Sequence, residues 1–273
     1  MRSSILGKYG ERRCVLHVKL MPVVRASTPA SGVHAAGSAH VASTNQRQPD
    51  KRCVLSRDRA TEVYNRAGAS IKDSSSVYGG PATDALIQAA ALESAVVVFE
   101  FGSGSGGLAE RLLSTVLHPQ CMYHAVDQSP VQVKLAQQRL SQFGKRAEVQ
   151  QCCGSPKEAA DHLPDGSVDA VISTYVLDIL SDHDIEDVLC TADRLLCPGG
   201  KLCLVGLTYG DTPLSKLASG IWDIIFAVRP EVVGGCRPQD ILPYLTPNWS
   251  VTTAQTIPGG LLRSQLVVAQ KSH

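Results

Sequence analysis

A glycine-rich segment in the first half of the chain has the composition of a ligand-binding turn. Glu100 lies near the end of an apolar run over residues 95–101, and Gly102, Gly104 and Gly106 follow it with serines between them. Glycine lets the backbone approach a ligand closely and adopt positive φ. The residues after this turn predict a helix, whose first backbone N–H groups would point toward the same ligand. We therefore expect the turn to bind a nucleotide-like cofactor.

Two cofactor-binding patterns fit this turn. The spacing Gly102-x-Gly104-x-x-Gly107 matches the dinucleotide fingerprint, and Asp127 lies where that fingerprint expects a ribose-binding acid. Preceded by Glu100, the same turn also matches E-x-G-x-G-x-G, the first motif of class I S-adenosylmethionine (SAM) methyltransferases. A carboxylate at the strand end would repel a pyrophosphate and attract ammonium and sulfonium groups. Glu100 therefore favours the second pattern.

Downstream segments extend the second pattern. The turn E-F-G-S-G-S-G is followed by A-V-D-Q-S-P at 125–130, L-P-D-G-S-V-D-A-V-I-S at 163–173 and L-L-C-P-G-G-K-L at 195–202. In this order the segments resemble the class I SAM-dependent methyltransferases, above all the ubiquinone/menaquinone-type (methyltransferase type 11) small-molecule enzymes. The resemblance covers residues 64–271. It implies SAM as methyl donor and a small-molecule acceptor.

The resemblance also implies cofactor contacts at the strand ends. Asp127 would accept both ribose hydroxyls, and Glu100 would reach the methionine end of SAM. The remaining expected contacts are Gly102, Ser103, Gly104, Gly106, Gln128, Gly154, Ser155, Ser173 and Tyr78, the last from a segment that closes over SAM in relatives. Ser155 stands where many relatives carry an adenine-binding acid, so the adenine contact is expected to be weaker or to come from the backbone.

Two residues after the fourth predicted strand are candidates for a catalytic role. A Tyr175 ring beside a sulfonium would add a cation–π attraction of about 1 kcal/mol, although a core aromatic would have the same spacing. Asp178, like His183, could act as a base toward a phenol or enol, or simply cap a helix. Methyl transfer is an in-line displacement in which alignment supplies most of the acceleration. A dedicated base is often unnecessary, and no metal is expected.

The elements that must position these residues alternate between strand and helix. Strands are predicted at 95–101, 121–127, 146–152, 168–174 and 200–207, and helices at 59–67, 82–91, 106–117, 130–143 and 182–196. This alternation predicts an α/β, Rossmann-like, doubly wound and mostly parallel seven-stranded sheet with helices on both faces. Runs at 251–257 and 262–270 flank a Pro-Gly-Gly turn and predict a hairpin with an antiparallel last strand.

Residues 208–247 form an insertion expected on the substrate side of the sheet. Its apolar stripe is expected to pack on the sheet while roofing the acceptor pocket, and comprises Leu214, Leu217, Ile221, Trp222, Ile225 and Val228. Such a roof favours a small, apolar or lipid-like acceptor. Arg237 would either face an anionic acceptor or hold the turn around it.

Composition limits the remaining possibilities. Residues 1–57 hold ten basic and two acidic residues in a chain of net charge +1. This predicts a transit-peptide-like or disordered leader before a domain at 58–273, and hence a plastid or mitochondrial location, with a cytoplasmic one as the alternative. The acidic remainder disfavours nucleic acid as a partner. No run reaches the roughly 18–20 apolar residues of a membrane span.

The cysteine content argues against a metal cluster or a disulfide-stabilised fold. Nine cysteines without a Cys-x-x-Cys pair indicate neither a zinc cluster nor a disulfide framework. An NAD(P)-dependent oxidoreductase, an aminopropyl transferase and a non-catalytic SAM-binding subunit remain as alternatives. The oligomeric state is left open.

Overall fold

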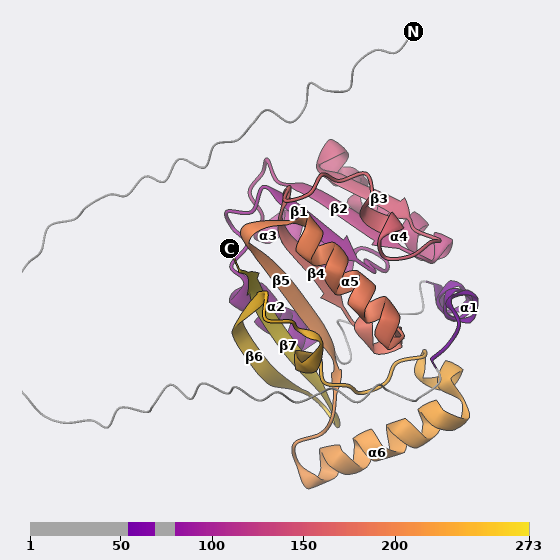
Figure 1. Ribbon diagram of the computed structural model, residues 1–273. Helices are drawn as coiled ribbons and strands as arrows, with labels where there is room; N and C mark the ends of the chain where they lie inside the picture. The colour runs from indigo at the N-terminus through magenta and orange to yellow at the C-terminus, as the bar shows by residue number, and fades with distance from the viewer. Residues whose placement is uncertain (1–53, 69–79, 273) are drawn as a thin grey trace, which may run out of the picture. The chain divides into compact units, whose positions relative to one another are not determined.

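A seven-stranded sheet lies at the centre of the computed structural model, which describes residues 54–68 and 80–272 (Figure 1). Its strand order is β3-β2-β1-β4-β5-β7-β6. The strands are β1 (Val97–Phe101), β2 (Met122–Asp127), β3 (Ala147–Gln151), β4 (Val168–Thr174), β5 (Leu196–Thr208), β6 (Trp249–Gly259) and β7 (Leu262–Lys271). The pairs from β3 to β5 are parallel, and β7 is antiparallel to both β5 and β6. The predicted fold is confirmed.

The strand order reverses next to β1. The chain moves from β1 outward to β2 and β3, then returns to β4 on the other side of β1. Glu100 of β1 pairs with Ala125 of β2 and Ile172 of β4. In open parallel sheets, ligands bind beyond the carboxyl ends of the strands at such a reversal. The fold therefore places the glycine turn after β1 at the expected binding position.

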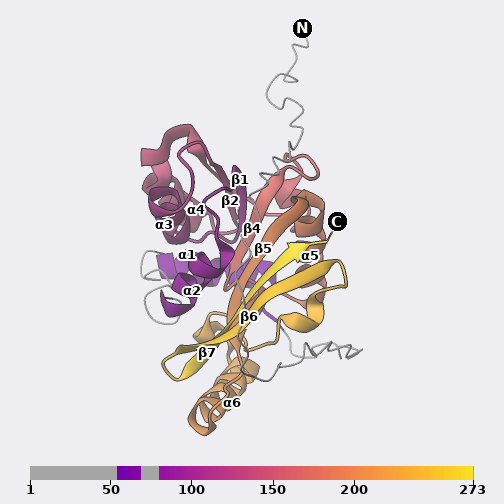
Figure 2. The same cartoon turned by 90° about the vertical axis from the view of Figure 1, so that its left-hand side faces the viewer.

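Helices cover both faces of the sheet. They are α1 (Arg57–Ala67), α2 (Gly80–Ala90), α3 (Gly107–Thr115), α4 (Pro130–Leu140), α5 (Asp182–Leu195) and α6 (Pro213–Val228), with 3-10 turns η3 (Ser141–Arg146), η4 (Glu158–Ala160), η5 (Leu177–Ile179), η6 (Pro230–Val233) and η7 (Leu242–Tyr244). Helices α2, α3 and α4 lie on one face and α5 on the other (Figure 2). No helix among residues 54–68 and 80–272 has the length and apolar character needed to cross a bilayer.

Local sequence accounts for most helix boundaries. Ser129 accepts a hydrogen bond from the Gln132 N–H and Pro130 occupies the first turn, which is a favourable start for α4. The helix predicted over 130–143 ends earlier, at Leu140, and continues as the η3 turn. Gly144 has φ 57°, so the chain leaves the helical conformation there.

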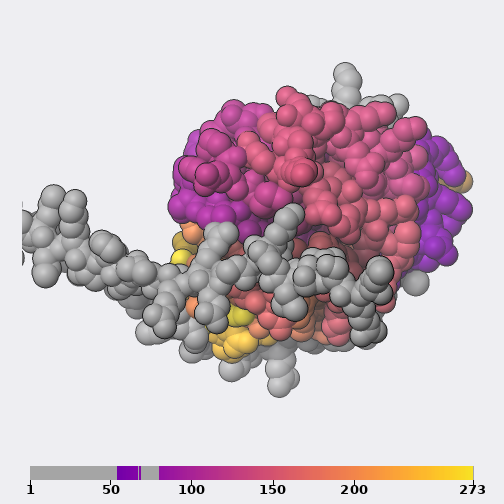
Figure 3. Space-filling model, turned by 90° about the horizontal axis from the view of Figure 1, so that it is seen from above, coloured from indigo at the N-terminus to yellow at the C-terminus, as the bar shows by residue number. Residues whose placement is uncertain are grey.

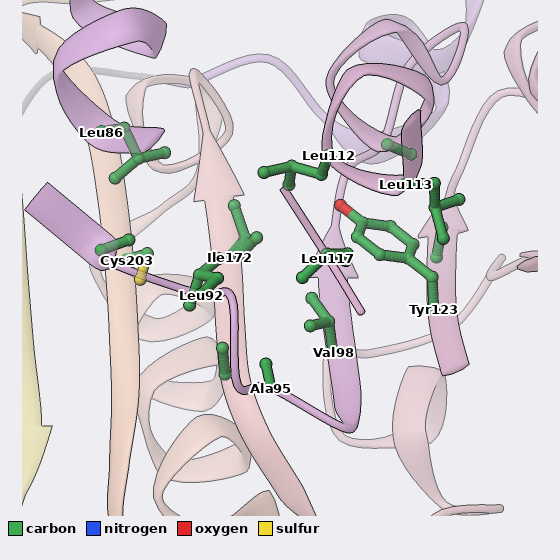
Figure 4. Close-up of a cluster of buried hydrophobic side chains, with 14 of the residues drawn as sticks. Leu86, Leu92, Ala95, Val98, Leu112, Leu113, Leu117, Tyr123, Ile172 and Cys203 are labelled. Carbon is green, nitrogen blue, oxygen red and sulfur yellow. The ribbon is translucent and has the colours of Figure 1, made fainter. Parts of the chain in front are cut away.

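Two apolar clusters hold the helices to the sheet. The first packs α2, α3 and α4 against one face, and in Figure 4 Leu112 and Leu117 lie beside Tyr123 and Val98. The second joins α5 to the other face. Full burial of each leucine in these clusters contributes about 1.5–3 kcal/mol relative to exposure.

Seen from above, the magenta and pink β1–β4 half occupies most of the described surface, with the yellow C-terminal hairpin at its lower margin (Figure 3).

The orientation of α6 differs from the prediction. Leu214, Leu217, Ile221 and Val228 were expected to pack on the sheet, yet they are 51–73% exposed. The buried side of α6 carries Ser215, Ser219 and Phe226 instead. The two serine hydroxyls accept hydrogen bonds from the N–H groups of Thr212 and Gly210, and the loop needs these acceptors on the inner side. Trp222 does turn inward as expected.

Candidate functional site

The turn between β1 and α3 needs glycine for two different reasons. Gly102, Gly104 and Gly106 all have positive φ, of 67°, 52° and 80°. A Cβ on Gly102 would lie 2.2 Å from Cγ2 of Val176, and one on Gly106 would lie 3.1 Å from the Ala136 Cβ. A Cβ on Gly104 would meet nothing within 4 Å. Gly102 and Gly106 therefore permit internal packing, whereas Gly104 borders open space.

Asp127 at the end of β2 holds this turn in place. Its Oδ2 accepts a 2.8 Å hydrogen bond from the Gly104 N–H, and its Oδ1 accepts one of 2.8 Å from the Ser129 N–H. Burial raises the pKa of Asp127, and these backbone hydrogen bonds oppose that rise. Each carboxylate oxygen has a second lone pair for a further donor. Asp127 is thus fixed and still able to accept hydrogen bonds from a ligand.

Glu100 is the most deeply buried acid beside the turn. It is 1% exposed, and the Tyr123 hydroxyl donates a 2.9 Å hydrogen bond to its Oε2. Burial raises the pKa of Glu100 to about 7, the hydrogen bond from Tyr123 lowers it, and the nearby charge of Asp127 raises it. Ionised Glu100 has no counter-ion among the groups that shift its pKa. A cationic ligand would favour its ionised form.

A single cavity of about 530 Å³ connects these residues. The predicted site residues that line it are Glu100, Gly102, Ser103, Gly104, Asp127, Gln128, Gly154 and Tyr175. Ser103 is 8% exposed, and its Oγ has no hydrogen-bond partner within the described residues. The cavity thus collects the unpaired Ser103 hydroxyl and the carboxylates of Glu100 and Asp127, and Gly104 leaves space beside them. These groups suit a ligand with several polar groups.

Four predicted site residues do not line the cavity. Gly106 packs against α4. Ser155 accepts a 3.4 Å hydrogen bond from the Glu158 N–H at the η4 turn. Ser173 is fully buried within β4, and its Oγ has no partner in the described part of the chain. Asp178 is also fully buried away from the cavity. Tyr78 lies outside the described residues.

Asp178 joins β5 to the insertion instead of facing a ligand. Its Oδ2 accepts a 2.8 Å hydrogen bond from the Leu207 N–H, and burial raises its pKa to about 7. The carbonyl oxygen of Asp178 accepts hydrogen bonds from the N–H and Nη1 of Arg237. Arg237 is 1% exposed and donates through Nη2 to the Leu180 carbonyl at 2.7 Å. Arg237 therefore holds the turn, and the expectation that it faces an acceptor finds no support.

The other end of the cavity is aromatic. Tyr64 of α1, Tyr175 after β4 and Trp222 of α6 all line it. The Trp222 Nε1–H donates a 2.9 Å hydrogen bond to the carbonyl of Cys236, whose Sγ lies 3.9 Å from the Tyr64 hydroxyl. Burial raises the pKa of Tyr64 well above its ordinary value and that of Cys236 to about 12. These side chains are neutral at physiological pH and provide shape and apolar surface.

Tyr175 has an unusual backbone. It has φ 56° although it is not glycine, and its hydroxyl lies 2.8 Å from the Ser264 Oγ. Burial raises its pKa to about 12, so the hydroxyl stays protonated at physiological pH. Tyr175 lines the cavity, and its side chain also packs against the apolar cluster formed with α2, α3 and α4.

Helix α1 forms part of the cavity wall through residues such as Arg57 and Tyr64. The Ser129 hydroxyl donates to Oδ1 of Asn65 at 2.6 Å, and Gln132 Nε2 donates to the Gly68 carbonyl at 3.2 Å. Arg57, the first residue of α1, forms an ion pair with Asp184 of α5. Arg57 and Tyr64 were missed as site residues because no motif marks them, and only their folding back over α4 brings them to the cavity.

An acid–glycine turn after β1, an acid at the end of β2 and an antiparallel seventh strand together define the class I methyltransferase fold. Residues 99–202 match the family model described as a methyltransferase domain. The resemblance to methyltransferases inferred from the sequence is thereby confirmed for this region of the chain.

Comparison with individual proteins supports the same class. An uncharacterized methyltransferase of Geobacillus thermodenitrificans (strain NG80-2) is 27% identical over 128 residues, which are 47% of this chain. The matched region spans about half of that relative, 54% of its length. The structure of an O-methyltransferase family protein from Burkholderia thailandensis has a TM-score of 0.58 at 18% identity, covering 79% of this chain and 60% of that one.

A second similar structure carries ligands. It is geranyl diphosphate C-methyltransferase from Streptomyces coelicolor A3(2), in complex with Mg²⁺, geranyl diphosphate and S-adenosyl-L-homocysteine. Its TM-score is 0.52 at 13% identity, covering 70% of this chain and 79% of that one. At these identities, the two structural likenesses establish the fold alone.

Proposed function

We propose that this protein is a SAM-dependent methyltransferase that acts on a small, apolar acceptor. One observation carries the proposal: a single cavity joins the polar end at Glu100, Gly104 and Asp127 to the aromatic end at Tyr64 and Trp222. A bisubstrate methyl transfer needs this division, because the donor is polar and the acceptor must lie in line with it. The matched methyltransferase domain over residues 99–202 supports the assignment.

The residues at the polar end fit SAM group by group. Asp127, fixed by two backbone N–H groups, can accept hydrogen bonds from both ribose hydroxyls. Glu100, buried and without a counter-ion, can pair with the ammonium of the methionine part. Gly104 leaves room for close approach, and Ser103 offers an unused hydroxyl. When bound, SAM would supply an electrophilic methyl group on a sulfonium.

The chain's own contribution would be alignment and exclusion of water. Tyr175 lines the cavity, and its ring could stabilise a nearby positive charge by about 1 kcal/mol. The hydroxyls of Tyr64 and Tyr175 stay protonated, and Asp178 lies outside the cavity. We therefore propose that the acceptor brings its own nucleophilic atom and that no Asp178 base acts on it.

The character of the acceptor follows from the aromatic end. Tyr64, Trp222 and Val233 line it, and the thiol of Cys236 stays neutral. These three side chains carry no charge that could compensate a charged acceptor for its lost hydration. We propose an apolar or aromatic molecule that reaches the cavity from the side of α6 and η6.

Calorimetric titration of the full chain with SAM, S-adenosylhomocysteine and NAD tests the cofactor. Micromolar binding of both adenosyl ligands without NAD binding is expected, because Glu100 would repel a pyrophosphate. Binding of NAD alone would instead support an oxidoreductase. Formation of S-adenosylhomocysteine with a panel of apolar phenols, thiols and amines then tests catalysis. SAM binding without turnover of any acceptor would favour a non-catalytic subunit.

We also propose that the basic segment 1–57 directs the protein to an organelle, on the strength of its composition. Most of this segment lies outside the described residues, and Arg57 begins α1. A fluorescent fusion of the full chain, compared with one lacking residues 1–53, tests the proposal. Identical cytoplasmic fluorescence from both would refute it.

A further inference from the structure

Tyr123 of β2 brings a hydroxyl into the apolar cluster beneath α3. The side chain is fully buried, and its ring lies beside Val98, Leu112 and Leu117 (Figure 4). A buried hydroxyl lowers stability unless it forms a hydrogen bond. A phenylalanine would fill nearly the same volume without that cost. The packing therefore accounts for the ring of Tyr123, and only its hydrogen-bond partner accounts for the hydroxyl.

That partner is Glu100, the buried acid of the cavity wall. The register pairs Tyr123 of β2 with Val98 of β1, and Glu100 lies two residues after Val98, so both side chains are on the same face of the sheet. The hydroxyl donates to Oε2 at 2.9 Å. Among residues 54–68 and 80–272, this is the hydrogen bond that Glu100 accepts, and Oε1 receives none. One carboxylate oxygen is held by the protein and the other is left for a ligand.

The other charged groups near this face are engaged elsewhere. On α2 and α3, Asp84 forms an ion pair with Arg111, and Glu110 forms one with Arg139 of α4. The strand neighbours of Glu100 are Ala125 of β2 and Ile172 of β4, which carry no charge.

Two ionisable groups act directly on Glu100. Burial raises its pKa to about 7, the Tyr123 hydrogen bond lowers it and the charge of Asp127 raises it. Burial also raises the pKa of Tyr123 well above its ordinary value, so the phenol remains a donor. Tyr123 is thus the group that favours the ionised form of Glu100.

We propose that Tyr123 is a positioning residue for the cofactor: it holds Oε2 of Glu100 so that the ionised carboxylate presents Oε1 to the ammonium group. The proposal rests on the proposed function, in which Glu100 pairs with the methionine end of SAM. A carboxylate that is already fixed loses little side-chain freedom when the ligand binds. Since the Tyr123 ring is packed beneath α3, the donor itself is fixed before the ligand arrives.

The proposal predicts an effect of Tyr123→Phe that depends on pH. A hydrogen bond to a carboxylate favours its charged form, so removing one donor should raise the pKa of Glu100, by about one pH unit. The ionised fraction then falls roughly tenfold at a pH below both titration midpoints, and hardly at all above them. S-adenosylhomocysteine should therefore bind Tyr123→Phe about tenfold more weakly than wild type near pH 6, and equally well near pH 9.

Calorimetric titration of the full-length proteins across this pH range measures the effect. The ratio of the two dissociation constants is taken at each pH, because the ligand's own titration cancels in it. Tyr244→Phe is the matched control, since it removes a hydroxyl that donates 2.8 Å to Asp182 outside the cavity. Its ratio to wild type should stay near one throughout. A ratio for Tyr123→Phe that is the same at every pH would overturn the proposal.

A double-mutant cycle separates positioning from packing. In a Glu100→Gln background the side chain no longer ionises, so adding Tyr123→Phe should not change how affinity depends on pH. A purely structural role of Tyr123 would produce the same loss in both backgrounds. An equal loss in the two backgrounds would therefore refute the positioning role.

A measurement without ligand tests the Tyr123–Glu100 pair on its own. Carboxyl carbon NMR follows the titration of Glu100, whose signal is identified by its absence in Glu100→Gln. The midpoint should rise in Tyr123→Phe and remain in place in Tyr244→Phe; an unmoved midpoint would overturn the proposal. Wild type that binds neither SAM nor S-adenosylhomocysteine at any pH would instead refute the proposed function, and the cofactor role of Tyr123 with it.

Discussion

The Tyr123 hydroxyl donates a 2.9 Å hydrogen bond to Oε2 of Glu100, and both side chains are buried. Tyr123 sits in the apolar cluster under α3, so its ring is held rigidly by packing (Figure 4). Burial raises the pKa of Glu100 to about 7, and this hydrogen bond limits the rise. The pair therefore holds at the glycine turn an acid whose pKa is raised by burial, to about 7.

Cofactor affinity should depend on pH through Glu100. If Glu100 pairs with the SAM ammonium, the ionised form binds, so affinity should rise with pH up to about 7 and then level off. Calorimetry in buffers of different ionisation enthalpy should detect proton release on binding at pH 6. Glu100→Gln should weaken binding and remove this proton release.

Asp178→Asn provides the control, because Asp178 also has a pKa of about 7 but lies outside the cavity. The Asn variant should leave the proton release unchanged. Both acids have folded-state pKa values above their unfolded ones, so each contributes stability at low pH that is lost as pH rises toward 7. Proton release that persists in Glu100→Gln would assign it to another group.

Asp127→Ala should weaken SAM binding by roughly 2–3 kcal/mol, the loss of charged hydrogen bonds. It also removes the acceptors of the Gly104 and Ser129 N–H groups, so a lower melting temperature should accompany the loss. Titration calorimetry and thermal unfolding measure the two effects. Asp165→Ala, which removes an exposed carboxylate paired with Arg194, should change neither binding nor fold. Unchanged affinity in Asp127→Ala would exclude the ribose role.

Alanine at two glycines of the turn should separate folding from binding. Gly102→Ala places a Cβ 2.2 Å from Val176, so the variant should melt several degrees lower or fail to fold. Gly104→Ala meets open space and carries only the cost of positive φ, about 1 kcal/mol. Its melting temperature should fall slightly while SAM affinity falls at least tenfold. Normal SAM affinity in Gly104→Ala would mean that the ligand does not approach this residue.

Trp222→Ala should act on the acceptor and spare the cofactor. The indole lines the aromatic end and donates to the Cys236 carbonyl. Its removal should raise the KM for an identified apolar acceptor at least tenfold with an unchanged SAM Kd. Steady-state kinetics and calorimetry provide the two numbers. Tyr244→Phe, which removes a hydroxyl bonded to Asp182, is a control expected to leave both unchanged. A weakened SAM Kd in Trp222→Ala would contradict this division of the cavity.

The site residues that could be predicted from the sequence are those whose position depends only on the order of strands and turns along the chain. Gly102, Gly104 and Asp127 lie at strand ends, and strand alternation alone brings them together. Tyr64 was missed because α1 reaches the cavity only by docking on α4 through Asn65 and Gln132. No periodicity encodes such a contact.

For two other expectations, the local sequence left the direction of the side chains open. Asp178 follows a strand, as a catalytic acid would, but its side chain turns to the Leu207 N–H. The α6 stripe has the spacing of a buried face, and only the hydrogen-bonding serines Ser215 and Ser219 reveal which side points inward. A hydrophobic pattern identifies the apolar face of a helix, but it does not show what that face packs against.

Tyr175 has a consequence for engineering and for evolution. A non-glycine residue at φ 56° costs of order 1–3 kcal/mol, so selection for folding alone would replace it with glycine or asparagine. Either replacement would remove the aromatic ring of a residue that lines the cavity. A programme that screens only for heat resistance would therefore discard this tyrosine and with it any contact that the ring makes with a ligand.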